Sequence, residues 1–132
     1  MAKAKKVKEI GLTMANKVGL LSEVTAAVAK AKVNITALCA YAMENTAYFM
    51  LTTQGHARAK KVLASLGAQV EEKDVVEVEM PNRAGELEKV AKRIADAGIN
   101  IEYVYGTARV GKTATCVFKT ADDGTAIKVI NK

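Results

Sequence analysis

The sequence predicts an α+β fold of two tandem units, each with the element order strand, helix, strand, strand, helix, strand (βαββαβ). The first observation is an internal repeat: Asn16–Leu21 recurs as Asn82–Leu87, 66 residues later, and the match continues without a gap for about 20 residues. The second is a change of apolar period inside each copy, from two residues to 3.6 and back to two. The third is composition, since 132 residues with 50% apolar content suffice for two small units with packed cores.

The first copy contains all six expected elements. They are strands at 10–14, 33–43, 47–52 and 69–72, and helices at about 21–31 and 56–66. The inward face of the first helix is expected to consist of Leu21, Val24, Val28 and Ala31. Glu44-Asn45 are the expected turn between the second and third strands, and Gly67 is placed to end the second helix in a left-handed conformation.

The second copy repeats this order but stops early. Its expected elements are strands at 76–80, 99–105 and 114–119, a hairpin turn at 110–112, and helices at 87–97 and about 126–130. No residues remain for a fourth strand, so one edge of the second sheet must be covered by something else. We therefore expect two ferredoxin-like domains with antiparallel sheets, at residues 1–73 and 74–132, the second lacking its last strand.

Charge and apolar content bear on the location of the chain. The net charge is +6, and four lysines crowd residues 3–8, so we expect residues 1–6 to be a frayed basic leader. No apolar run approaches the roughly 20 residues that span a bilayer, and the first residues lack the apolar core of a secretion signal. These features predict a cytoplasmic protein with no membrane partner. Cys39 and Cys116 stand far apart and are expected to be reduced core residues.

The repeated segments resemble the ACT domain family. The residues that carry this resemblance are Asn16, Gly19, Leu21, Asn34 and Ile35 in the first copy, and Asn82, Gly85, Leu87 and Gly98–Ile101 in the second. Lys32 stands at the position of Gly98. The resemblance implies a regulatory module, without catalytic chemistry or cofactor, that binds a small amino acid between domains or at a dimer interface. The ligand-binding residues that it implies are Asn82, Ala84, Gly85, Glu86, Leu87, Asn100 and Ile101 in the better-matching second copy, with Asn16, Val18, Gly19, Leu20, Asn34 and Ile35 in the first.

The loop that opens the first helix of each copy is chemically suited to a zwitterion. A helix N-terminus offers unsatisfied backbone N–H groups and a positive dipole end to a carboxylate. An asparagine amide both donates and accepts hydrogen bonds, so it can serve either end of a free amino acid. A purely structural interpretation stands beside this one: Asn16 and Asn82 would cap helices, and the glycines would only permit turns.

Sharper chemical interpretations find little support in the residues present. His56 is the only histidine and stands at an expected helix start, which disfavours acid–base or nucleophilic catalysis. The acidic pairs at 71–72 and 122–123 have no partner histidines or calcium-loop spacing, so no metal site is expected. The segment 106–113 ends in Gly-Lys-Thr but is flanked by strands, which favours a hairpin over a phosphate loop.

Nucleic-acid binding is a weaker alternative. The same topology occurs in RNA-recognition modules whose strands stack bases on aromatic residues, and this chain has four tyrosines and a basic start. Its third strands lack the basic, glycine and aromatic motif of those modules. Tyr103 and Tyr105 are expected to fill a domain interface or to form the apolar wall of a ligand pocket.

Uncovered sheet surfaces predict association. We expect a homodimer in which sheets or helices of two chains pack together, with a regulated protein partner as a further expectation. An amino acid bound between domains would favour the arrangement that closes around it, and the coupling free energy in such regulation is about 1–3 kcal/mol. A module with empty ligand sites that regulates a partner is the alternative function.

Overall fold

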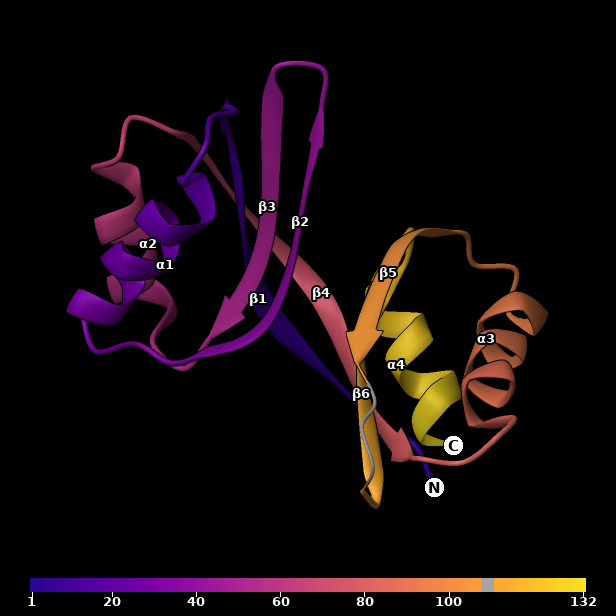
Figure 1. The fold of residues 1–132 in the computed structure, drawn as a ribbon. Coiled ribbons are helices and arrows are strands. Elements are labelled where there is room, and N and C mark those ends of the chain that lie inside the picture. Colours follow the sequence, from indigo (N-terminus) through magenta and orange to yellow (C-terminus); the bar gives the residue numbers. More distant parts are fainter. Residues whose placement is uncertain (108–110) are drawn as a thin grey trace. The chain divides into compact units, whose positions relative to one another are not determined.

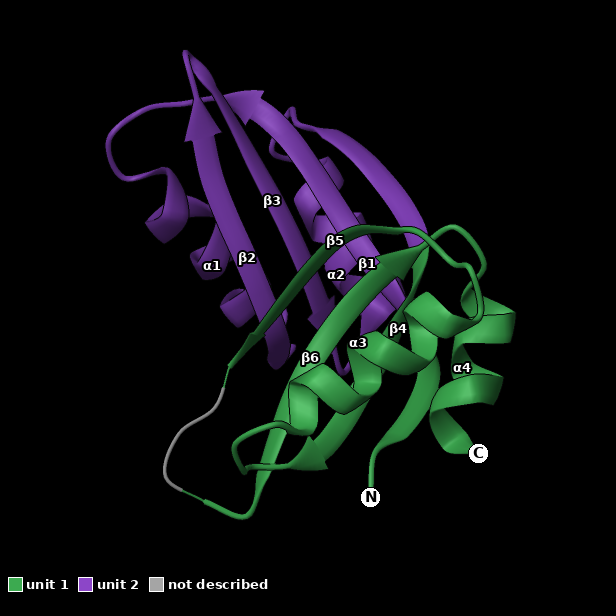
Figure 2. Cartoon of the chain, turned by 90° about the vertical axis from the view of Figure 1, so that its right-hand side faces the viewer, with its two compact units in different colours: residues 1–7, 74–132 green, residues 8–73 purple. Residues whose placement is uncertain are grey.

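The computed structural model describes residues 1–107 and 111–132, which form two compact units. Unit 1 comprises Met1–Val7 with Asp74–Lys132, and unit 2 comprises Lys8–Lys73 (Figure 2). The elements, in chain order, are β1 (Lys3–Ala15), α1 (Leu20–Lys30), β2 (Ile35–Met43), β3 (Thr46–Thr53), α2 (His56–Ala64), β4 (Gln69–Pro81), α3 (Glu86–Asp96), β5 (Ile101–Thr107), β6 (Thr113–Thr120) and α4 (Asp123–Asn131) (Figure 1). The predicted α+β class with tandem ferredoxin-like units is confirmed.

Unit 2 is a four-stranded sheet covered on one face by two helices. Its strand order is β2-β3-β1-β4, and α1 and α2 lie together on one side of it (Figure 1). β1 pairs antiparallel with β3 so that Leu12 lies opposite Phe49, and both side chains are buried in the core beneath the helices. The alternating apolar residues of the strands therefore pack against the apolar faces of α1 and α2 in one cluster.

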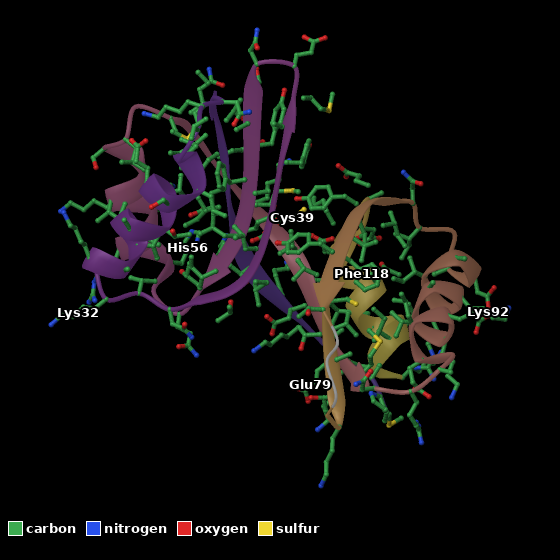
Figure 3. The ribbon with its side chains drawn as sticks, viewed as in Figure 1. Lys32, Cys39, His56, Glu79, Lys92 and Phe118 are labelled. Carbon is green, nitrogen blue, oxygen red and sulfur yellow. The ribbon has the colours of Figure 1, made fainter. Side chains whose placement is uncertain are left out.

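Unit 1 has the same layers, built from β4, β6 and β5 with the first part of β1. Its core contains Val78 from β4, Phe118 from β6, Ile94 from α3 and Ile130 from α4. Figure 3 shows Phe118 among the side chains between the sheet and these helices. β4 is a single strand of 13 residues, so the two separate strands expected at 69–72 and 76–80 are one continuous element.

The expectation of a frayed basic leader is wrong. Residues 3–7 begin β1 and are assigned to unit 1, where they follow β4 antiparallel and Lys5 Nζ lies 3.4 Å from Glu77 Oε2. Ala4 is only 8% exposed and packs into the core of unit 1. The strand that the second copy lacks is thus supplied by the beginning of the chain, and the boundary of the first domain moves from residue 1 to residue 8.

Asn131, at the end of α4, holds this strand in place. The Ala4 N–H donates to Asn131 Oδ1 over 2.7 Å, and Asn131 Nδ2 donates to the Ala4 carbonyl over 2.9 Å. One side chain therefore satisfies both backbone polar groups that Ala4 presents away from β4. An amide in this position takes the place of a neighbouring strand and protects the edge.

The inward face of α1 and α3 differs from the prediction by one residue. Leu20, Val24 and Val28 are the buried residues of α1, whereas Leu21 is 52% exposed. In α3 the equivalent of Leu20 is Glu86, which is 8% exposed, and Leu87 is 49% exposed. Residues at i, i+4 and i+8 share one helix face, so the stripe begins one residue earlier than expected, while its next two members in each helix are buried as predicted. A carboxylate consequently points inward where an apolar side chain was expected.

Loop geometry follows the repeat closely. Gly67 has φ +80°, as expected for the end of α2, although α2 stops at Ala64, two residues early. The turn at Glu44-Asn45 joins β2 and β3, whereas the turn expected at 110–112 begins on a residue outside the described ranges. Lys32 (φ +59°) adopts the left-handed conformation that Gly98 (φ +73°) adopts at the end of α3.

Candidate functional site

A cavity of about 370 Å³ lies in unit 1, where the end of β4 and the first turn of α3 meet the last part of β5 and the beginning of β6. It is lined by Met80, Pro81, Asn82, Arg83, Glu86, Leu87, Val104, Tyr105, Gly106, Thr107, Ala114 and Cys116. Three of the residues expected to bind a ligand, Asn82, Glu86 and Leu87, are among them. Ala84 and Gly85 belong to the same loop but do not line the cavity.

The loop from Asn82 to Gly85 is held by hydrogen bonds from Asn82 to the segment that precedes β6, and these bonds do not involve the first turn of α3. The Asn82 N–H donates to the Lys112 carbonyl over 2.9 Å, and its side-chain Nδ2 donates to the Gly111 carbonyl over 3.2 Å. Gly85 is the N-cap residue of α3, with φ +88°, and no side chain caps the helix. By contrast, Asp122 caps α4 by accepting from the Thr125 N–H. The N-cap residue of α3 is therefore Gly85 and not Asn82, and the first N–H of the helix, that of Glu86, donates to the Arg83 carbonyl over 3.3 Å.

Glu86 places a carboxylate against this cavity. Its Oε2 accepts from Arg83 Nη2 over 3.2 Å and from Lys89 Nζ over 3.0 Å. Hydrogen bonding to Lys89, together with the positive charges of Lys89 and Arg83, lowers the pKa of Glu86 despite its burial. The group is therefore ionised at neutral pH.

Asn100 and Ile101 lie at the opposite end of β5 from the cavity. Ile101 pairs with Thr120 of β6, whereas Thr107 pairs with Thr115 near the cavity. Six residues of strand correspond to about 20 Å, so unit 1 does not bring Asn100 to Asn82. The Asn100 carbonyl instead accepts the Ala121 N–H over 2.9 Å. Residues that the sequence grouped in one site are thus separated within the unit.

The first copy repeats this geometry with different side chains. The Asn16 N–H donates to the Asn45 carbonyl over 2.8 Å, and Gly19 (φ +85°) is the uncapped N-cap residue of α1. Val18 is fully exposed, while the side chain of Leu20 is buried in the core of unit 2 and its N–H donates to the Lys17 carbonyl over 3.3 Å.

The start of β2 is the remaining part of the first-copy prediction. Asn34 Nδ2 donates to Gln54 Oε1 over 3.3 Å, and Ile35 pairs with Thr53, at the far end of the sheet from Asn16. The two halves of the expected site are therefore separated in this copy as well.

Tyr105, which the sequence offered as the apolar wall of a ligand pocket, lines the cavity, whereas Tyr103 does not. Sequence reasoning missed the other residues that β5 and β6 contribute. A Cβ on Gly106 would come within 2.5 Å of Cys116 Sγ and 2.9 Å of the Thr115 carbonyl, so only glycine lets the two strands lie this close. A glycine inside a strand was the signal available in the sequence. Cys116 is a free, half-buried thiol whose pKa is raised by burial. Cys39 is also free and half-buried.

Other chemistry in the described residues is sparse. His56 Nε2 lies 2.5 Å from Glu72 Oε2 in unit 2, and Lys60 Nζ contacts the same oxygen. Within residues 1–107 and 111–132, no cluster of three or more His, Cys, Asp or Glu side chains is arranged to hold a metal ion. No helix in the same ranges is both long and apolar enough to cross a membrane. The segment 106–113 includes three residues outside the described ranges.

Comparison with known proteins identifies the family. A family model described as an ACT domain pair matches residues 5–132. The crystal structure of protein BT0572 from Bacteroides thetaiotaomicron is similar, with a TM-score of 0.89 and 30% identity over 97% of this chain and 88% of that chain. The ligand-free regulatory subunit of aspartate kinase from Thermus thermophilus shares the fold, with a TM-score of 0.73 and 14% identity over 98% of this chain and 94% of that chain. A search of the curated proteins gave no match. Since the family model spans almost the whole chain, this protein belongs to the ACT domain family, as a pair of ACT domains.

Proposed function

We propose that the chain is a non-catalytic regulatory protein that binds a small amino acid in the unit 1 cavity. The observation that carries this proposal is the meeting of an uncapped helix N-terminus and an ionised carboxylate at one cavity of about 370 Å³. The N–H groups of α3 suit a ligand carboxylate, and Glu86 suits an ammonium. A cavity of this size is at the small end of ligand pockets, as a free amino acid requires.

In this proposal, Asn100 and Ile101 contribute to the ligand site from the other chain of a homodimer. An amide at the start of β5 is about 20 Å from the cavity in its own unit, but a homodimer can present it to the cavity of a partner. Ligand binding would then stabilise the dimer, and the output would pass through assembly or through a regulated protein.

A thermal-shift screen of the full chain against the twenty amino acids tests the proposal. At about 10 mM ligand and a dissociation constant of about 0.1 mM, binding adds about 2.7 kcal/mol of stability and raises Tm by about 10 °C. We expect one chemical class of amino acid to give this shift. A screen with no shift would reject ligand binding and favour a partner-regulating module with empty sites.

Three asparagine variants locate the site. Asn82→Ala should reduce the shift, and Asn16→Ala, at the equivalent loop of unit 2, should leave it unchanged if unit 1 alone binds. Asn100→Ala tests whether the other chain of a homodimer contributes to the site, because the Asn100 side chain lies outside the cavity of its own unit. Loss of the shift in Asn100→Ala, together with ligand-dependent dimerisation in size-exclusion chromatography, supports the shared site. An unaffected Asn100→Ala variant assigns binding to the single-chain cavity.

A further inference from the structure

At Glu86 the second repeat carries a charge where the first repeat has an apolar core residue. Its counterpart, Leu20, is 3% exposed and belongs to the core of unit 2, whereas Glu86 is 8% exposed at the same place in unit 1. A carboxylate so nearly buried costs free energy unless it is paired, and an apolar residue already fits this position of the fold. The first turn of a helix favours a negative charge, but Leu20 shows that the fold does not require one at this position.

The Glu86 carboxylate is nearly buried, whereas the two cations that contact it are exposed. The Glu86 side chain is 10% exposed, while those of Arg83 and Lys89 are 68% and 65% exposed. Both cations contact the same carboxylate oxygen, Oε2, and among the described residues no donor reaches Oε1. The buried anion is thus held in place, its cations extend from solvent, and one carboxylate oxygen is left for another donor.

The remaining lining of the cavity is mostly apolar. Met80, Leu87, Val104 and Ala114 contribute aliphatic or thioether surface, and both Leu87 and Val104 are about half exposed. Among the described residues that line the cavity, Glu86 is the only acidic one and Arg83 is the only basic one. The two charged groups therefore share the cavity with aliphatic surface and with the polar residues Asn82, Tyr105 and Thr107.

We infer that Glu86 selects the ligand of unit 1, and that this ligand is an α-amino acid with an uncharged, apolar side chain. This inference rests on the proposed function. Arg83 Nη2 and Glu86 Oε2 are 3.2 Å apart, and the ammonium and carboxylate of an α-amino acid are attached to one carbon atom, so the zwitterion fits across the pair. Its ammonium donates to Glu86, its carboxylate accepts from Arg83 and the first turn of α3, and its side chain contacts Leu87 and Val104.

Calorimetric titration of the full chain with L-leucine and L-methionine tests this assignment. Glu86→Gln keeps the size of the side chain and removes its charge, and Glu88→Gln is the matched control because Glu88 is an exposed residue in the same helical turn. We expect Glu86→Gln to weaken binding at least tenfold and Glu88→Gln to leave it unchanged. L-Glutamate and L-lysine should bind at least tenfold more weakly than L-leucine, because the described residues that share the cavity with Leu87 and Val104 include, beyond Arg83 and Glu86, no charged partner for a second charge.

A ligand that lacks the carboxylate and a variant at the exposed Arg83 test the two charged contacts separately. Neither depends on whether a variant of the buried Glu86 folds. Arg83→Ala alters an exposed side chain and should weaken the binding of L-leucine, because the ligand carboxylate loses a partner. For 3-methylbutylamine, which lacks the carboxylate, affinity should depend on Glu86 and not on Arg83.

The outcomes distinguish this inference from the function on which it rests. If L-leucine or L-methionine binds equally well to Glu86→Gln and to the unaltered chain, the inference is wrong and the proposed function stands. Preferential binding of L-glutamate or L-lysine has the same consequence. If no amino acid binds the unaltered chain, both are wrong.

Discussion

Asn131 should determine how firmly the first strand is attached to unit 1. Replacing it with alanine removes both hydrogen bonds to Ala4, at 2.7 and 2.9 Å, and leaves a backbone donor and acceptor at a residue only 8% exposed. A net hydrogen bond contributes about 1 kcal/mol, and an unsatisfied buried group costs about 1–3 kcal/mol. We therefore expect Asn131→Ala to destabilise unit 1 by about 2–3 kcal/mol.

Native-state hydrogen exchange is the assay, because units 1 and 2 have separate cores and a global unfolding curve would mix their contributions. The Ala4 amide should lose protection in Asn131→Ala, while amides of α1 in unit 2 should not change. Asn131→Asp keeps an acceptor for the Ala4 N–H but has no donor for its carbonyl, so it should preserve protection at Ala4 better than alanine does. The exposed neighbour Lys132 provides the control variant. Protection at Ala4 that is equal in Asn131→Ala and the unaltered chain would refute the clamp.

Three further predictions follow from single residues. Lys32→Gly should stabilise unit 2 by about 1 kcal/mol, and Gly98→Ala should destabilise unit 1 by about 1–2 kcal/mol, because both positions have positive φ and no neighbouring atoms crowd a Cβ at Gly98. Hydrogen exchange of the core amides of each unit measures both changes, and the opposite signs would contradict this. Hydrogen bonding to His56, a residue labelled in Figure 3, lowers the pKa of Glu72 below its ordinary 4.5. The contribution of Glu72 to stability is therefore present above pH 4.5 and is lost as the pH falls through the lower folded-state value. Glu72→Gln should therefore flatten the acid limb of a stability–pH curve, and parallel curves would exclude the linkage. Gly106→Ala should displace β5 from β6 and abolish ligand binding in the thermal-shift assay, whereas a normal shift would show that the cavity tolerates the change.

The sequence alone determined the features that depend on neighbouring residues. The repeat, the change of apolar period and the turn residues predicted which segments form strands and helices. Helix ends illustrate why: Lys32 N–H bonds to the Ala29 carbonyl over 2.9 Å, and Gly98 N–H bonds to the Ala95 carbonyl over 2.9 Å. The next residue in each copy bonds five residues back over 3.2 Å. The same local pattern therefore gives the same end in both copies, even with a lysine in the glycine position.

Only the tertiary structure decided the features that depend on distant residues. Ala4 and Asn131 are 127 positions apart, and no local pattern indicated that a lysine-rich start would become the missing strand. Helical periodicity could be counted from either leucine of the first repeat, and only packing against the sheet selected Leu20 and, with it, Glu86. The family resemblance implied one site that contains Asn82 and Asn100, but an intervening helix and the strand direction put them at opposite ends of the sheet. Sequence similarity assigned these residues to a family, and the course of the chain in space determines which of them share a cavity.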